Sequence, residues 1–545
     1  MSVEASQAKK DLRSARKESH CPGVSSSGGV IMLNHCGRNS KVSTALSSEV
    51  PSAARWGQRA AQTSWRFCLV TLIGSTSISC NLATESASQP PVHIGSIEWL
   101  PNPSMVTGGM LHVQCTGATA LQISYVASGL DSASTPRVPV SNCPARAALL
   151  GLLPSTTYRT RVTAWGQAGD SSIAPGPVVS TGELPNTLPM VNAVSLAGIS
   201  SGLTVFTVLN PVLSASEGTA LIVDSIGRIR WYLQLNQRIQ DLEPEADGRL
   251  FLSLMNSDPF VSGQLDYITG QYHAIDMAGN YLGKWTITGP YFTDAHEIRM
   301  TSRGTALLLG FDIRQMDLSS FGGQTNAQVV GNLLQEVDSV GRIFFLWNAF
   351  DHFGITDIDP SVPLTGARID WNHGNAVEID ADGNYLISFR NLSEVSKISS
   401  QNGTVLWRLG GARNEFQFGG DTSKFSFQHG VRRLANGNLI LFDNGNTHSP
   451  PFSRAVEYRV DETARTATLV WQYRPDPDLY SFALGFAQRL SSGNTLVTFG
   501  PRSTVHEVSP SSRLLWSLTL PGGGWIYRAY RIRSLYDSRL DIPGN

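Results

Sequence analysis

The chain contains an internal repeat, and this repeat constrains the fold more than any other feature. Six segments each consist of a turn and a strand-like run that ends in tryptophan, at Trp231, Trp285, Trp347, Trp407, Trp471 and Trp516. Consecutive tryptophans lie 45 to 64 residues apart, and a blade of four short strands needs about 40–50 residues. The repeat therefore predicts a β-propeller with six blades, with a set of unrelated β-hairpins as the alternative.

The local pattern within the repeat is that of strands. The runs NYLISF, NLILFD and NTLVTF each follow a Gly-centred turn, which is typical of β-hairpins. Glycine is abundant, charged residues make up only 16% of the chain, and helical periodicity is scarce. We predict an all-β protein, with a six-bladed β-propeller at residues 196–540 preceded by a small β-sandwich.

The N-terminal region differs in composition. Residues 1–66 are rich in Ser, Ala, Lys and Arg, which predicts a disordered leader or an extension from a misassigned start. Residues 67–80 combine a basic flank, a short apolar run and small residues before Cys80, as in a secretory signal. We predict an exported protein of the periplasm or cell envelope. Either Cys80 is lipidated, which would be the only expected membrane contact, or the signal is cleaved nearby in the ordinary way. A buried apolar strand is a further interpretation.

Residues 93–182 form a separate segment of alternating strands. The run from Leu153 to Trp165 resembles the turn and strand of fibronectin type III domains, in which a tyrosine such as Tyr158 packs at the corner of the sandwich. Cys115 and Cys143 lie in this segment, and either a disulfide between them or two buried free thiols fits the sequence. Residues 183–195 are the expected linker to the propeller.

Three histidines recur near the start of a repeat hairpin. Aligned on the turn glycines, the corresponding residues are His296, His373, His429 and, in a further copy, Gly485. Because the inner strands of a propeller line a common channel, we expect the three histidines to converge at one mouth. Asn375, two residues after His373, is expected on the same strand face.

Arg390 ends the strand that follows His373, at a position where neighbouring repeats carry Asn444 and Gly500. Three histidines with an arginine suit either a histidine-only metal site or transfer of an oxyanion group, with one histidine as nucleophile and the arginine as a clamp. An arginine opposes a divalent cation, and each histidine alone also fits a structural role. We predict no metal and no cofactor. The net charge of −1 does not suggest a nucleic-acid partner.

Several of these segments together resemble the arylsulfotransferase family. They are Asp294–Met300, the stretch from Asp370 to Gly411, Phe425–Asn446 and Ser453–Tyr458, within an overall resemblance at residues 200–520. The resemblance implies a six-bladed propeller that transfers a sulfuryl group from an aryl sulfate to a phenol by a ping-pong mechanism through a sulfohistidine, without a nucleotide sulfate donor.

The resemblance also implies a role for each candidate residue. His429 matches the family's nucleophile, His296 and His373 match histidines that bind sulfate or assist proton transfer, and Arg390 and Asn375 match the sulfate-binding pair. The expected partners are small aryl sulfates and phenols. A non-catalytic binding propeller and a metal-dependent hydrolase are the alternatives, and the sequence does not give the natural substrates or the oligomeric state.

Overall fold

The computed structural model describes residues 90–210, 217–245, 247–255 and 269–543. Within these ranges the regular elements are β-strands and short 3-10 turns, and there is no α-helix. The predicted all-β class is therefore confirmed. The predicted leader, the signal segment and Cys80 lie outside the described residues. In the described part of the chain, no helix has the length and apolar character needed to cross a membrane.

The first group of strands forms two facing sheets. One sheet contains β1 (His93–Pro101), β2 (Gly108–Thr116) and β6 (Ala145–Leu150). The other contains β3 (Ala118–Ala127), β4 (Ala133–Ser134), β5 (Val138–Pro139), β7 (Thr157–Gly166) and β8 (Ser171–Ser180). Alternate residues of the strands, such as Leu111, Ile123 and Val162, are fully buried and form one core. The hydroxyl of Tyr158 accepts a hydrogen bond from the Leu153 N–H at 2.9 Å, which fixes the turn before β7.

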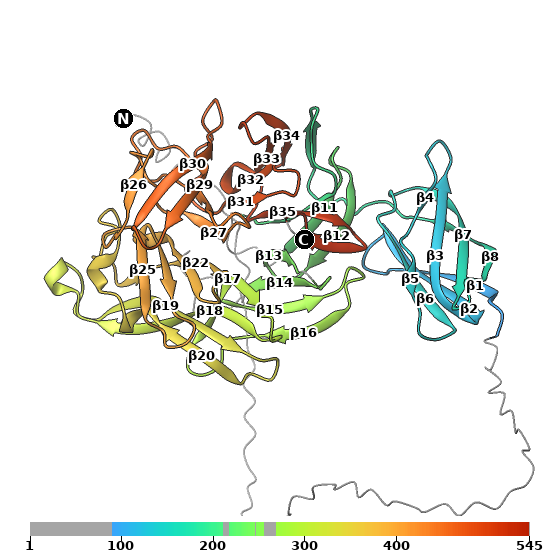
Figure 1. Cartoon of the computed structure of the whole chain (residues 1–545), viewed down its shortest axis with the longest axis horizontal. Coiled ribbons are helices and arrows are strands. Elements are labelled where there is room, and N and C mark those ends of the chain that lie inside the picture. The colour runs from blue at the N-terminus through green and yellow to red at the C-terminus, as the bar shows by residue number, and fades with distance from the viewer. Residues whose placement is uncertain (1–89, 211–216, 246, 256–268, 544–545) are drawn as a thin grey trace, which may run out of the picture. The chain divides into compact units, whose positions relative to one another are not determined.

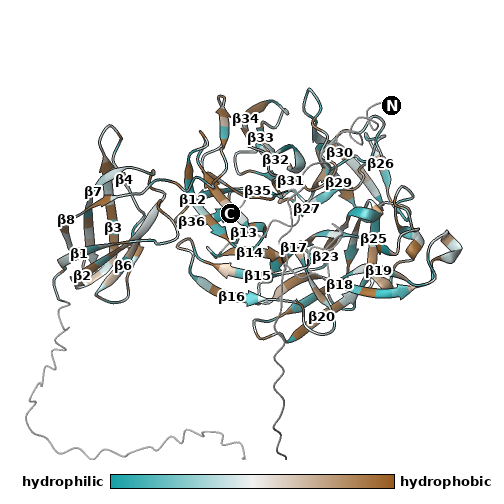
Figure 2. Ribbon diagram, turned by 180° about the vertical axis from the view of Figure 1, so that it is seen from behind, coloured by the Kyte–Doolittle hydropathy of each residue, from teal (hydrophilic) through white to brown (hydrophobic). Residues whose placement is uncertain are grey.

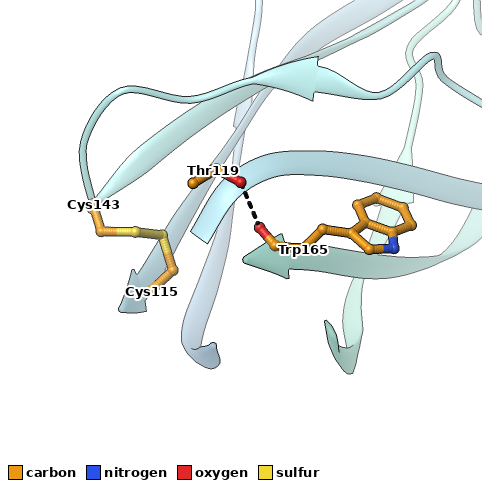
Figure 3. Close-up of a disulfide and its surroundings, with 4 residues drawn as sticks. All are labelled: Cys115, Thr119, Cys143 and Trp165. Carbon is orange, nitrogen blue, oxygen red and sulfur yellow. Dashed lines mark hydrogen bonds between the residues drawn. A yellow bond between two sulfur atoms is a disulfide. The ribbon is translucent and has the colours of Figure 1, made fainter. Parts of the chain in front are cut away.

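A disulfide joins Cys115 at the end of β2 to Cys143 in the segment between β5 and β6 (Figure 3). The same view shows Thr119 of β3 donating a hydrogen bond to the carbonyl of Trp165 on β7, at 3.2 Å. The two cysteines are separated by 28 residues in sequence. The disulfide therefore closes a loop that crosses from one sheet of the sandwich to the other and back.

Replacing both Cys115 and Cys143 by serine should lower the free energy of unfolding of the sandwich by about 3–4 kcal/mol. The reason is that a crosslink over a loop of this length removes chain entropy from the unfolded state. Urea unfolding followed by circular dichroism measures the change, and reduction of the wild-type protein should produce a similar shift. An unchanged unfolding midpoint in both experiments would contradict the expectation.

The remaining strands form six sheets among the described residues, antiparallel except where β21 joins β19 and β26 joins β30 in parallel. The first contains β12 (Ile229–Leu235), β11 (Gly218–Val223), β10 (Leu203–Val208), β35 (Ala529–Ser534) and β36 (Asp537–Leu540); the second contains β13 (Ile239–Pro244), β14 (Leu250–Met255), β15 (Gly270–Ile275) and β16 (Tyr281–Trp285). The third contains β17 (Phe292–Met300), β18 (Ala306–Met316), β19 (Ala327–Val337) and β20 (Ile343–Asn348), with β21 (Arg368–Asp370) beside β19.

The other three sheets follow the same pattern. The fourth contains β22 (Gly374–Ile379), β23 (Tyr385–Phe389), β24 (Glu394–Ile398) and β25 (Val405–Gly410). The fifth contains β27 (His429–Arg433), β28 (Leu439–Asp443), β29 (Arg454–Asp461), β30 (Thr466–Tyr473) and β26 (Gln417–Gly419). The sixth contains β31 (Phe486–Arg489), β32 (Thr495–Phe499), β33 (Thr504–Val508), β34 (Leu514–Thr519) and β9 (Asn192–Ser195).

One strand from each sheet belongs to a closed ring. Strand β13 contacts β17, β17 contacts β22, β22 contacts β27, β27 contacts β31, β31 contacts β35, and β35 contacts β13 (Figure 1). The ring closes because β35, from the end of the chain, pairs with β10 in the first sheet. These six strands line a common centre, as in a β-propeller, and β13 lies three strands away from β27 in the ring.

The repeated tryptophans lie in the fourth strand of each sheet, counted from the ring. Trp231, Trp285, Trp347, Trp407, Trp471 and Trp516 lie on β12, β16, β20, β25, β30 and β34. Five of the six indoles are buried, and Trp471 is half-buried. Polar and apolar residues alternate in short bands along the strands (Figure 2). The sequence repeat therefore encodes the packing between neighbouring sheets, because each tryptophan fills the space next to the following sheet.

Candidate active site

The three predicted histidines lie together at the ring of inner strands. His296 is in β17, His373 immediately precedes β22, and His429 begins β27. The ring centroids of His296 and His373 are 5.0 Å apart, and the ring planes make an angle of 67°. The charges of Arg390, His373 and His296 all act on His429. Four predicted residues from three sheets are thus brought to one place, and we call His296, His373, Arg390 and His429 the histidine cluster.

The orientation of His429 is fixed by Asn444. The side-chain nitrogen of Asn444 donates hydrogen bonds to the carbonyls of Ser481 and Leu484, at 2.7 and 2.9 Å. The amide oxygen of Asn444 therefore faces His429, and it lies 2.7 Å from Nδ1. Because an amide oxygen only accepts hydrogen bonds, Nδ1 of His429 carries the proton. This tautomer leaves the lone pair on Nε2.

His429 is also held in its neutral form. Its side chain is almost completely buried, with 2% of its surface exposed. Burial, followed by the charge of Arg390, lowers the pKa of His429 well below its ordinary value, although the hydrogen bond to Asn444 acts in the opposite direction. Near neutral pH His429 is therefore an uncharged imidazole, and the lone pair on Nε2 suits it to act as a nucleophile.

The other two histidines face carboxylates instead of an amide. Nδ1 of His296 lies 2.5 Å from the carboxylate of Asp294, and Nδ1 of His373 is hydrogen-bonded to the carboxylate of Asp370. Asn332 donates to the second oxygen of Asp294 at 2.9 Å. A carboxylate at Nδ1 orients the imidazole and stabilises the imidazolium once it forms. His296 and His373 are therefore better suited than His429 to hold or donate a proton.

Arg390 approaches the cluster from the end of β23. Its backbone N–H donates to the carbonyl of His373 at 2.9 Å, which ties the two residues together. Its guanidinium donates to the Asn391 side chain and to the Phe482 carbonyl, at 2.7 and 3.1 Å. The guanidinium lies over the ring of Phe427, 4.8 Å from its centroid. Burial lowers the pKa of Arg390, although Asp370 opposes this effect.

The position of Asn375 differs from the prediction. We expected it to share a strand face with His373, but His373 lies outside β22 and has a positive φ of 48°. The left-handed backbone changes the direction of the chain between the two residues. The Asn375 side-chain nitrogen donates to the carbonyl of Gln428 at 2.7 Å, next to His429, and its side-chain oxygen is buried without a hydrogen-bond partner in the described part of the chain.

Three residues of the site were missed at the sequence level, namely Asp294, Asp370 and Asn444. Asp294 and Asp370 precede their histidines by two and three residues, so a nearby acidic residue was a signal within reach. Asn444 corresponds to Arg390 in the next repeat, and the sequence pointed to it only through that correspondence. Its pairing with His429 joins the two ends of the β27–β28 hairpin, which local sequence does not reveal.

A network of buried ion pairs lies next to the histidine cluster. Glu297, the residue after His296, accepts hydrogen bonds from Arg432 and Arg528, at 3.1–3.2 and 3.0 Å. Burial raises the pKa of Glu297, but Arg299, Arg432 and Arg528 outweigh it and lower the pKa to about 2. Arg528 also donates to the carbonyl of Asn375 at 2.7 Å. These bonds connect β17, β22, β27 and the segment before β35. They therefore hold the strands that carry the histidines in position relative to one another.

The nitrogen and oxygen groups of the histidine cluster are not arranged as a metal site. Among the residues that the structure describes, no group of three or more His, Cys, Asp or Glu side chains has a metal-binding arrangement. In the cluster itself, each Nδ1 is already hydrogen-bonded to an oxygen acceptor. That the site works without a metal stays a prediction from the sequence.

The fold and the cluster define a β-propeller protein with a central site of histidines and one arginine. The arylsulfotransferase (ASST) family model matches residues 193–514, which is more than half of the chain. The chain therefore belongs to the arylsulfotransferase family, as the sequence motifs predicted.

Two curated relatives are similar over about half of the chain. Arylsulfate sulfotransferase AssT of Escherichia coli O6:H1 is 23% identical over 357 residues, and AssT of Lelliottia amnigena is 23% identical over 354 residues. Each alignment covers 53% of this chain and 58% of the relative.

Solved structures show weaker similarity. A protein of unknown function from Bacteroides caccae has a TM-score of 0.39 and 13% identity, covering 60% of this chain and 98% of that chain. Virginiamycin B lyase from Staphylococcus aureus has a TM-score of 0.31 and 10% identity, covering 60% of this chain and 87% of that chain.

Proposed function

We propose that the protein transfers a sulfuryl group from an aryl sulfate to a phenolic acceptor, without a nucleotide sulfate donor. Membership of the arylsulfotransferase family supports this activity, and the two curated relatives carry the name arylsulfate sulfotransferase. The observation that carries the proposal is the hydrogen bond from His429 to Asn444, because it leaves a neutral imidazole with its Nε2 lone pair available.

The proposed first half-reaction forms a sulfohistidine. Nε2 of His429 attacks sulfur, the S–N bond forms, the bond from sulfur to the aryl oxygen breaks, and the phenolate leaves with the electron pair. Arg390 binds the sulfate oxygens and stabilises their charge. His296 or His373, each backed by a carboxylate, donates a proton to the departing oxygen.

The second half-reaction reverses these steps. A phenol enters after the first product leaves, and the same histidine removes its proton while the phenolic oxygen attacks the sulfur of sulfohistidine. The S–N bond breaks and His429 returns to the neutral form. Because one product leaves before the acceptor binds, the mechanism is ping-pong. Asn375, which is hydrogen-bonded beside His429, is proposed to bind a sulfate oxygen through the remaining hydrogen of its amide nitrogen.

The proposed location is outside the cytoplasm, in the periplasm or cell envelope. The disulfide between Cys115 and Cys143 supports an oxidising compartment, because such bonds are rare where thiols are kept reduced. A lipid anchor at Cys80 stays a prediction from the sequence.

Intact mass after brief mixing with p-nitrophenyl sulfate, without an acceptor, tests the proposed function. We expect a mass gain of one sulfuryl group together with release of nitrophenol, and peptide mapping should place the group on His429. The adduct should disappear when a phenol is added. Absence of both the adduct and nitrophenol across several aryl sulfates would contradict the proposal.

A further inference from the structure

A second set of polar groups lies at the start of β13, on the opposite side of the ring from His429. Gln240 has only 1% of its surface exposed. Neither its side-chain oxygen nor its side-chain nitrogen has a hydrogen-bond partner within the described ranges. Two residues earlier, Nε and Nη1 of Arg238 are also buried without a hydrogen-bond partner there. Burial alone lowers the pKa of Arg238, and no acidic neighbour offsets it.

The internal repeat places these two residues at the level of the histidine cluster. Gln240, His296, Asn375 and His429 each lie eight residues before a turn glycine, at Gly248, Gly304, Gly383 and Gly437. All four glycines have positive φ, and each closes the same type of turn, through an N–H to carbonyl hydrogen bond three residues back. By the same count, Arg238 and His373 each lie ten residues before their turn glycine. His373 is therefore offset by two residues from the alignment with His296 and His429 that we expected from the sequence.

The strand pairing confirms that these hairpins correspond. The pairs Asp241↔Ser253 in β13–β14 and Ala376↔Ser388 in β22–β23 lie at the same distances from their turn glycines. Both hairpins have a bulge immediately before these pairs, at Gln240 and Asn375, and a bulge changes the direction of the side chains next to it. Strands β13 and β27 lie three places apart in the ring, so the start of β13 faces the start of β27 across the centre.

The backbone at this position is fixed although the side chains have no partner. The carbonyl of Gln240 accepts from the Thr207 hydroxyl at 2.8 Å, and the carbonyl of Arg238 accepts from the Met255 N–H at 2.9 Å. Two buried guanidinium nitrogens and a buried amide without partners cost free energy, unless a ligand completes their hydrogen bonds. Guanidinium N–H groups beside an amide NH₂ match the oxygens of a carboxylate or sulfate.

We propose that Arg238 and Gln240 form a second anion-binding subsite, which receives an acidic substituent on the aromatic ring of the substrate. The inference rests on the proposed function, since the aromatic ring is placed between this subsite and His429. Arg390 binds the group that is transferred, and the Arg238–Gln240 subsite binds the opposite end of the molecule. Substrates with an acidic group remote from the phenolic oxygen are therefore preferred.

A matched pair of acceptors tests the subsite. With p-nitrophenyl sulfate as donor, we compare 4-hydroxyphenylacetate with its neutral amide, 4-hydroxyphenylacetamide. The wild-type protein should prefer the acid, and Arg238→Met should lower the ratio of kcat/KM for the acid to that for the amide by about 10- to 100-fold. Gln240→Glu should lower the same ratio, because a carboxylate in the subsite repels the acid. Arg228→Gln, at a half-exposed arginine in the turn between β11 and β12, is the matched control and should leave the ratio unchanged.

A binding measurement separates this inference from the proposed function. Calorimetric titration of 4-hydroxyphenylacetate, without a sulfate donor, should give a Kd at least about tenfold higher in Arg238→Met than in the wild-type protein. If the wild-type protein transfers no sulfuryl group but this difference in Kd is found, the proposed function fails and the subsite stands. If transfer occurs while Arg238→Met and Gln240→Glu keep both the ratio and the Kd, the subsite is wrong. Arg238→Lys keeps the charge, so it should retain most of the preference for the acid in both measurements.

Discussion

Replacement of His429 by alanine should lower kcat/KM for transfer from p-nitrophenyl sulfate to phenol by about 10⁴-fold or more. The proposed covalent intermediate cannot form without Nε2, and loss of a nucleophile in enzymes of this kind costs several orders of magnitude. The residual rate reflects binding and charge stabilisation by the remaining residues of the cluster. Initial rates of nitrophenol release, measured with and without acceptor, check the prediction.

His506→Ala is the matched control for this experiment. His506 is also a buried histidine in a strand of the propeller region, and burial lowers its pKa to about 4. Its Nδ1 is hydrogen-bonded to the Tyr473 hydroxyl at 2.9 Å, away from the cluster. Both variants lose a buried imidazole, but only His429→Ala should lose transfer. Full activity in His429→Ala, or equal loss in the two variants, would show that His429 is not the nucleophile.

Replacement of Asn444 by aspartate should make transfer strongly dependent on pH. In the wild-type protein the pKa of His429 is well below 6.5, so this histidine stays neutral, and able to attack, between pH 6 and 8. A carboxylate at position 444 favours the imidazolium and therefore raises that pKa. The variant should therefore lose activity as pH falls through the raised pKa, and regain part of it at high pH.

The complete pH profile of kcat is the measurement, and two further variants test its interpretation. Asn444→Leu removes the acceptor for Nδ1–H, so kcat should fall by about 10²- to 10⁴-fold at every pH without a new acid limb. Asn414→Asp is the matched control. The side-chain nitrogen of Asn414 also donates to a carbonyl, that of Phe416 at 2.7 Å, in the segment after β25 and away from the histidine cluster. A flat profile in Asn444→Asp, or the same acid limb in Asn414→Asp, would contradict the proposed role of Asn444.

These predictions depend on a division of roles among three similar histidines. His429 faces an amide oxygen, whereas His296 and His373 face carboxylates. The same side chain therefore meets an uncharged acceptor at Nδ1 in one place and a carboxylate in two others. This difference, more than the number of histidines, makes one suited to attack sulfur and the others suited to move a proton.

Much of the fold was predictable because it is encoded by short-range pattern. Alternating apolar residues, Gly-centred turns and the recurring tryptophans predicted an all-β chain, and each tryptophan lies at the same place in its sheet. The position of each histidine near the start of a hairpin was also visible, because distance from a turn glycine is a local property. The six-bladed count was predicted from the repeats, and the fibronectin type III resemblance stays a prediction.

Only the tertiary structure decided which atoms meet. The pairing of His429 with Asn444 depends on the two carbonyls that fix the Asn444 amide, and these come from the segment before β31. The positive φ of His373 separates it from Asn375, which points to Gln428 instead. Arg238 and Gln240 belong to no sequence motif, and only their burial and register point to a role for them.

The sequence by itself thus determined the strands, the repeat and the residues that approach the centre, because these follow from local periodicity. The tautomer of His429 and the partners of each polar group depend on contacts between sheets, which no local pattern contains.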